Sequence, residues 1–121
     1  MSPDLVMDFE LTVKQQLTRL HKDVFGLGPK SVYVKLSRDM LVIKCTGCFT
    51  TLEKRLLVEK GHDYVLDLRR CLVLDLVKQM TARRLFGTDV IDFHLTILPM
   101  SDAMHCFFVL KDDIEQLLSL S

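Results

Sequence analysis

The sequence lacks several features that mark particular classes of protein. No apolar run approaches the roughly 20 residues that a membrane-spanning helix needs, so we expect a soluble protein without direct membrane insertion. No secretory signal is recognisable near the N-terminus, which favours a cytoplasmic location. Sixteen basic residues balance sixteen acidic ones. Because there is no net charge, composition gives no argument for nucleic acid or an anionic membrane as the main partner.

A complete set of metal ligands is also missing. Cys45 and Cys48 have a spacing that can hold zinc, but zinc usually takes four ligands and no second pair follows. Cys71 falls within a helical pattern and Cys106 within a strand pattern. We therefore expect reduced thiols, no metal and no cofactor, with Cys45 and Cys106 as small apolar core residues.

No catalytic constellation is recognisable either. His94 and His105 flank a turn at Pro99 and can be near neighbours across two strands, but we favour the interpretation that they are two polar residues on a solvated sheet face. The segment 26–29 has no lysine and hydroxyl residue in the phosphate-binding arrangement, so we interpret it as a turn. We predict that the chain is not an enzyme and has no catalytic residue.

The longest uninterrupted pattern predicts a central helix over residues 62–86, between Gly61 and Gly87. Its apolar residues cover about half of the helix surface. They are Val65, Leu66, Leu68, Leu72, Val73, Leu76, Val77 and Met80. One sheet can cover only part of so wide an arc. We therefore predict a homodimer in which Leu74, Val77 or the exposed side of the sheet forms the contact.

The remaining pattern predicts three more helices and two hairpins. A helix capped by Ser2, with Pro3 at its first position, ends at Gly26. Strands at 31–36 and 40–45 form the first hairpin, and a capping box from Thr50 to Glu53 begins a short helix.

The second hairpin pairs a strand at 89–98 with one at 103–110. The first of these alternates, with Ile91, Phe93, Leu95 and Ile97 on its apolar side. A closing helix follows, capped by Asp112 with Glu115. We predict a single domain over residues 1–121 of the α+β class. Its order is α-β-β-α-α-β-β-α, with one four-stranded antiparallel sheet and helices mainly on one face.

Arg69 falls near the middle of the apolar arc of the central helix. A buried arginine needs a carboxylate, because removing an unpaired charge from water costs several kcal/mol or more. Glu53 and Asp92 are the two candidates, and we favour Glu53. The alternative is that the arginine lays its aliphatic stem over the arc and keeps its charge in water.

Two segments flank the first predicted hairpin: Gly26-Leu27-Gly28-Pro29 before it and Gly47-Cys48-Phe49-Thr50-Thr51-Leu52-Glu53 after it. Together they resemble the MpsC-like family of small bacterial domains, whose pattern has a Gly-Arg-Gly-Pro turn and a Gly-x-Leu-Thr-x-x-Glu segment. Leu27 replaces the family arginine and Phe49 replaces the family leucine. The matching positions are Gly26, Gly28, Pro29, Gly47, Thr50, Glu53, Gly61, Arg69 and Gly87.

The resemblance implies association with a sodium-linked, membrane-potential-generating system, in which a membrane subunit works with a large soluble protein. Related pairs take up inorganic carbon. The resemblance implies no catalytic residue. We therefore expect a non-enzymatic, dimeric accessory domain of a Na+- or H+-linked transport complex, held at the inner membrane only through a protein partner.

Two other functions fit the sequence. The first is a regulatory domain or enzyme that binds a small molecule through His94, His105 and nearby cysteines. The second is RNA binding by the basic residues in the middle of the chain, although acidic residues are interleaved with them. Those basic residues are Lys54, Arg55, Lys60, Arg69, Arg70, Lys78, Arg83 and Arg84.

Overall fold

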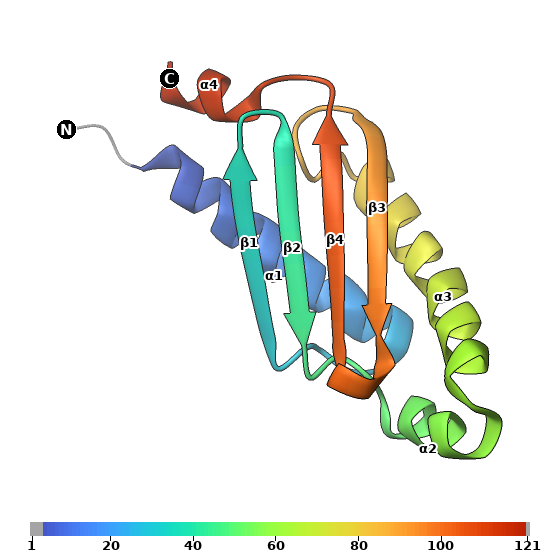
Figure 1. The fold of residues 1–121 in the computed structure, drawn as a ribbon. Helices are drawn as coiled ribbons and strands as arrows, with labels where there is room; N and C mark the ends of the chain where they lie inside the picture. Colours follow the sequence, from blue (N-terminus) through green and yellow to red (C-terminus); the bar gives the residue numbers. More distant parts are fainter. Residues whose placement is uncertain (1–3, 121) are drawn as a thin grey trace.

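The computed structural model describes residues 4–120, which form an antiparallel sheet and a layer of helices (Figure 1). In chain order the elements are α1 Leu5–Phe25, β1 Ser31–Ser37, β2 Met40–Thr46, α2 Thr51–Lys60, α3 His62–Ala82, β3 Val90–Leu98, a short 3-10 helix Pro99–Ser101, β4 Ala103–Leu110 and α4 Ile114–Ser119. This confirms the predicted α+β class and the α-β-β-α-α-β-β-α order.

The strand order in the sheet is β1-β2-β4-β3, and all neighbours are antiparallel. The two hairpins therefore lie side by side, with β2 and β4 in the centre. Helices α1 and α3 lie behind the sheet as Figure 1 draws it. No helix within residues 4–120 covers the front face.

The core lies between the sheet and this helix layer. One side of each strand faces it, with Leu41 and Ile43 of β2 and Phe108 of β4 almost fully buried. The helices supply the facing residues, among them Val13, Leu17 and Leu20 of α1 and Val65, Val73, Leu76 and Met80 of α3. Alternation along the strands and a period of three to four along the helices place these residues on one side.

One predicted helix cap differs from the structure, and another lies outside the described residues. The predicted start at Ser2 and Pro3 lies outside the described residues, and within them α1 begins after Asp4, whose carboxylate accepts from the Met7 amide at 3.0 Å. Helix α4 is capped by Asp113 instead of Asp112. The Asp112 carboxylate accepts from the Thr88 hydroxyl at 2.6 Å, so a tertiary contact uses the side chain that the local pattern assigned to the cap.

The central helix is shorter than predicted. It ends at Ala82, because Arg84 takes a left-handed conformation with φ of 50° and the Leu85 amide donates to the Met80 carbonyl at 3.2 Å. Phe86 is buried and its ring packs on that of Phe108, with centroids 5.1 Å apart. The apolar pattern continued to Phe86 because this residue belongs to the core, although it lies in a turn.

Three of the four residues predicted to lie on the apolar side of strand β3 face the core. A register shift between Val90 and Asp92 places Val90 opposite Leu110 and Asp92 opposite Val109. A bulge of this kind interrupts the alternation, and Ile91 is consequently 65% exposed. Phe93, Leu95 and Ile97 face the helix layer as predicted.

The loop glycine Gly47 has φ of +59°, and a Cβ atom there would lie 2.6 Å from the Lys30 Cβ. Gly26 has φ of +81° but open space around it, which makes it a matched control. We predict that Gly26→Ala costs about 1 kcal/mol of backbone strain and that Gly47→Ala costs roughly 1–3 kcal/mol more. Urea unfolding of both variants measures the difference. Equal losses would show that Lys30 moves aside at no cost.

Candidate functional site

The most unusual feature of the interior is the side chain of Arg69, which is fully buried in the middle of α3. Its Nε donates to Glu53 Oε2 at 2.8 Å and its Nη2 to Glu53 Oε1 at 3.2 Å. This bidentate ion pair is itself almost completely shielded from solvent. The predicted pairing of Arg69 with Glu53 is confirmed, and Asp92 and the solvent-exposed alternative are excluded.

The guanidinium group has further partners on other elements. Nη2 also donates to the Cys48 carbonyl, and Nη1 lies 3.1 Å from His21 Nε2. The Phe25 and Phe49 rings lie 4.0 and 4.3 Å from its central carbon. A desolvated cation over aromatic faces gains an electrostatic attraction. We call Arg69, Glu53, His21, Phe25 and Phe49 the arginine cluster.

His21 holds a single tautomer within the arginine cluster. A carbonyl oxygen can only accept and a guanidinium can only donate, so Nδ1 donates to the Leu27 carbonyl at 2.5 Å and Nε2 accepts from Arg69. Burial lowers the pKa of His21 to about 4, with a further decrease from Arg69 that the Leu27 bond and Glu53 oppose. This histidine is therefore neutral at neutral pH.

Glu53 has two structural roles. The Thr50 amide donates to Glu53 Oε1 at 2.9 Å, and the Glu53 amide donates to Thr50 Oγ1 at 3.1 Å. The predicted capping box is therefore present, and the same carboxylate holds Arg69. Thr50, Glu53 and Arg69, which match the family pattern, meet at this point.

The other family-pattern positions lie in turns. Gly26, Gly28 and Pro29 belong to the turn that presents the Leu27 carbonyl to His21, and Gly47 begins the loop that presents the Cys48 carbonyl to Arg69. Gly61 separates α2 from α3, while Gly87 lies between α3 and β3.

Sequence reasoning missed the part of the cluster formed by His21, Phe25 and Phe49. A signal for His21 was present, because it follows Leu17 by four residues and Leu20 by one, on the buried face of α1. Nothing local to Phe25 or Phe49 indicates that these rings enclose an arginine from a helix far along the chain.

The cysteines do not form a site with the histidines. Cys45, Cys48 and Cys106 are buried, and burial raises the pKa of all three thiols, that of Cys48 to about 11 and that of Cys106 to about 12. They are therefore protonated at neutral pH. No group of three or more His, Cys, Asp or Glu residues that could hold a metal occurs within residues 4–120.

His94 and His105 lie on the opposite, uncovered face of the sheet. His94 pairs with Phe107, and Thr96 pairs with His105, so the two histidines are diagonal neighbours across β3 and β4. His94 forms an exposed contact with Asp92 at 3.4 Å. The structure brings these two residues near each other but separates them from the cysteines by the thickness of the sheet.

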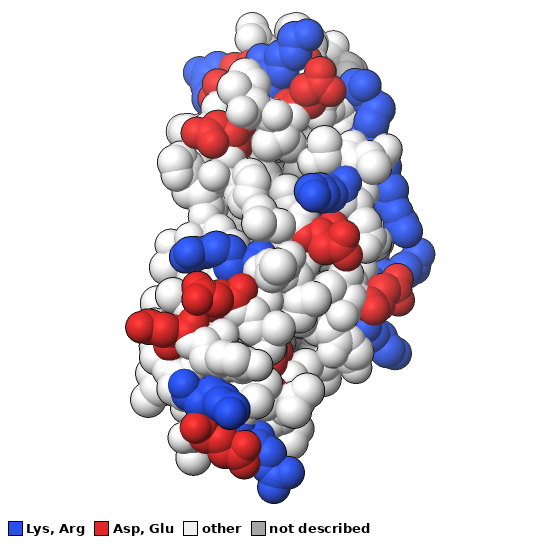
Figure 2. Space-filling view, turned by 90° about the vertical axis from the view of Figure 1, so that its right-hand side faces the viewer, with Lys and Arg blue, Asp and Glu red and all other residues white. Residues whose placement is uncertain are grey.

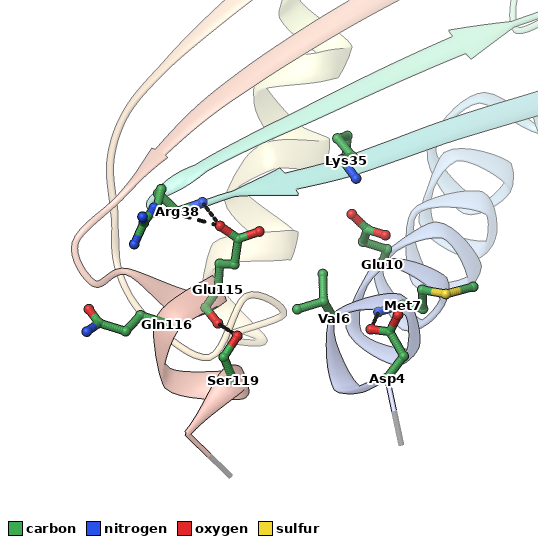
Figure 3. Close-up of a pocket in the computed structure, with 9 residues that line it drawn as sticks. All are labelled: Asp4, Val6, Met7, Glu10, Lys35, Arg38, Glu115, Gln116 and Ser119. Carbon is green, nitrogen blue, oxygen red and sulfur yellow. Dashed lines mark hydrogen bonds and ion pairs between the residues drawn. The ribbon is translucent and has the colours of Figure 1, made fainter. Parts of the chain in front are cut away.

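A cleft of about 610 Å³ lies between the start of α1, the end of β1 and α4 (Figure 3). Its carboxylates are engaged by backbone amides: Glu10 Oε2 accepts from Leu36 at 2.7 Å, and Glu115 Oε1 accepts from Arg38 at 3.2 Å. These contacts fasten α1 and α4 to the first hairpin. The cleft has no paired nucleophile and base.

The basic residues in the middle of the chain do not form one basic surface. Arg69 is buried, Lys54 pairs with Asp102 at 3.1 Å and Arg55 pairs with Glu59 at 3.9 Å. Figure 2, which looks onto the right-hand side of Figure 1, shows Lys and Arg interspersed with Asp and Glu. This face has the mixed charges of a solvated surface.

Helix α2 contains an exposed ion pair, Arg55–Glu59, that serves as a control for Arg69–Glu53. We predict that Arg69→Ala costs roughly 3–5 kcal/mol, because it leaves the Glu53 carboxylate buried without a partner. A double-mutant cycle should give a coupling energy of at least about 2 kcal/mol for Arg69–Glu53 and below about 0.5 kcal/mol for Arg55–Glu59, which is exposed. Similar couplings for both pairs would contradict this account.

Buried, neutral His21 makes stability depend on pH. Between pH 6.5 and about 4 the unfolded chain binds a proton at this residue that the folded chain does not. The free energy of unfolding should therefore fall as the pH decreases through this window, by up to about 3 kcal/mol. His21→Asn should flatten the dependence, as measured by urea unfolding at several pH values. An equal flattening in His62→Asn, which removes a surface histidine, would contradict the assignment.

Comparison with known proteins gives one family match. The family model MpsC, described as "Na+-translocating membrane potential-generating system (MpsC)", matches residues 7–112. No match was found among curated proteins or among solved structures. No helix within residues 4–120 is long and apolar enough to cross a membrane. Because the matched region includes the whole sheet and the arginine cluster, the family pattern is present as a folded unit. The chain belongs to the MpsC family of the Na+-translocating membrane potential-generating system.

Proposed function

We propose that this chain is a non-enzymatic accessory protein that self-associates and binds a protein partner in a Na+- or H+-linked membrane transport system, including systems for inorganic carbon uptake. It acts on the cytoplasmic side and is held at the membrane through that partner. The family description supports the link to a membrane-potential-generating system.

The observation that carries the non-enzymatic assignment is the state of the arginine cluster. Every buried side-chain nitrogen and oxygen atom within residues 4–120 has a hydrogen-bond partner. Arg69 and Glu53 are the residue types that often bind substrates, but each donor and acceptor here is used to join secondary-structure elements. A group that is closed to solvent, and whose hydrogen-bond donors and acceptors are all paired, has no hydrogen-bonding capacity left for a ligand.

A binding role is favoured by the apolar surface that remains uncovered. The front face of the sheet carries no helix, and an apolar hollow of about 390 Å³ lies between α3 and β3. Leu74 of α3 is 42% exposed there and Phe93 of β3 forms the opposite wall. Contiguous exposed apolar surface is typical of proteins that bind other proteins.

The RNA-binding alternative receives no support from charge, because acidic residues neutralise the basic ones (Figure 2). The small-molecule alternative has one observation in its favour, which is the proximity of His94 and His105 on the open face.

The proposal is tested in the native host by deleting the gene and measuring membrane potential with a voltage-sensitive dye at several Na+ concentrations. The Na+-dependent part of the potential should decrease and should return when the chain is supplied again. A tagged copy should also retain the membrane subunit of the system after detergent extraction. An unchanged potential together with no retained membrane subunit would overturn the proposal.

A matched variant separates this function from RNA binding. Arg70→Gln combined with Arg83→Gln removes two exposed positive charges from α3 and the turn after it. We expect this folded variant to restore the potential as fully as the natural sequence does. A failure to restore it, combined with normal stability, would favour RNA binding instead.

A further inference from the structure

The strand registers identify the residues that lie on the front face of the sheet. Four rows run across the strands in the order β1, β2, β4, β3. They are Ser37-Met40-Val109-Asp92, Lys35-Val42-Phe107-His94, Tyr33-Lys44-His105-Thr96 and Ser31-Thr46-Ala103-Leu98. We call these sixteen residues the open face. The residues between them along each strand point to the core.

The open face has an apolar centre and a polar margin. Val42 and Phe107 lie next to each other on the two central strands, and Met40 and Val109 lie beside them in the next row. Charged and polar residues lie mainly at the edges. The one central cation, Lys44, directs its ammonium over the Tyr33 ring at 5.7 Å, away from Phe107. An apolar centre within a polar rim is the usual anatomy of a protein interface.

The charges at the two edges of the open face have opposite sign. Lys35 lies on β1 at one edge, and Asp92 lies on β3 at the other. Lys35 also lines the cleft beside β1, and Figure 3 shows its side chain directed toward Glu10. The positive edge of one copy can therefore attract the negative edge of a second copy of the same chain.

A twofold axis parallel to the strands, between β2 and β4, brings these features together. It places β1 of one copy over β3 of the other and keeps the rows aligned. Val42 then faces Phe107 of the second copy, Met40 faces Val109, and Lys35 reaches Asp92 in the neighbouring row. A twofold axis perpendicular to the strands and through the centre of the four rows would instead place Val42 over Lys44, and one along the second row would place Lys35 of one copy over Lys35 of the other. Of these three arrangements, only the first matches the apolar centres and also brings Lys35 within reach of Asp92.

The open face is also large enough for a stable pair. Four strands spaced about 4.8 Å apart and four rows about 6.7 Å apart cover roughly 500 Å² per chain. The two copies together bury about 1,000 Å² in projection, and the accessible surface of the side chains exceeds its projection. This value reaches the size at which specific interfaces begin. Two sheets stacked in this way resemble the layers of a sandwich.

We propose that the open face is the self-association surface of this protein, and that two chains pack sheet on sheet with Val42 and Phe107 at the centre and Lys35 of each chain paired with Asp92 of the other. The inference rests on the self-association in the proposed function and specifies its surface and its symmetry.

The first test is analytical ultracentrifugation of the whole chain and of two matched variants. Phe107→Lys places a charge at the centre of the open face, and Leu74→Lys places the same charge in the hollow beside α3. We expect dimers from the natural chain and from Leu74→Lys, and for Phe107→Lys a dimer dissociation constant that is raised at least about 100-fold in favour of monomer. Monomers from the natural chain at high micromolar concentration, or intact dimers from Phe107→Lys, would overturn the proposal.

A charge exchange tests the symmetry. In Lys35→Asp the two cross-chain contacts become acid against acid, and in Asp92→Lys they become base against base. Each variant alone should be weakened as a dimer. Mixed together, they should form a heterodimer in which both contacts are again of opposite charge, as native mass spectrometry of the two masses would show. Circular dichroism melting checks that each variant is folded, because Asp92 also accepts from the Phe93 amide at 2.9 Å.

The absence of a preferred heterodimer while the natural chain dimerises would overturn this orientation of the two copies. These outcomes are independent of the membrane-potential measurement. A dimer that forms through another surface would overturn the open-face proposal without affecting the proposed link to the transport system. An unchanged membrane potential would overturn that link without affecting the conclusion about the dimer.

Discussion

The fold depends on the need to satisfy one buried guanidinium group. Arg69 lies on the core side of α3, where an unpaired charge costs several kcal/mol or more. Its partners come from α1, from the loop after β2, from α2 and from β4, where Met104 Sδ lies 3.9 Å from Nη1. These elements are held in one arrangement because each must supply its atom at the same point.

This constraint explains why glycine turns accompany Arg69 and Glu53 in the family pattern. The turn at 26–29 presents the Leu27 carbonyl to His21, and the loop at 47–50 presents the Cys48 carbonyl to the arginine. A carbonyl can be aimed only if the backbone takes the required angles, and Gly26 and Gly47 both have positive φ. The pattern therefore marks the architecture of the fold, and none of its positions lies on the proposed open face.

The sequence was most informative where local patterns and tertiary contacts agree. Periodicity placed the helices and strands in the correct order, and the position of Arg69 within an apolar arc predicted its pairing with Glu53. It failed where a distant contact overrides a local signal. The Thr88 hydroxyl donates to the Asp112 carboxylate, which therefore does not cap α4. A bulge in β3 turns Ile91 toward solvent, and Phe86 is buried in the core although it lies in a turn instead of a helix. The cluster around His21 could not be assembled in advance, because its members meet only after the sheet and helices have packed.

The two departures from the family pattern separate architecture from surface. Leu27 replaces an arginine, yet the fold uses its carbonyl, which any residue supplies, and its side chain is 40% exposed. Phe49 replaces a leucine in the buried cluster, where its ring lies against the guanidinium at 4.3 Å and adds an attraction that an aliphatic side chain lacks. The Phe49 change therefore acts on stability, while the Leu27 change removes a positive charge from the surface without altering the core. Because the fold uses the carbonyl of Leu27 and leaves its side chain partly exposed, the side chain at this position belongs to the surface of the turn and not to the core.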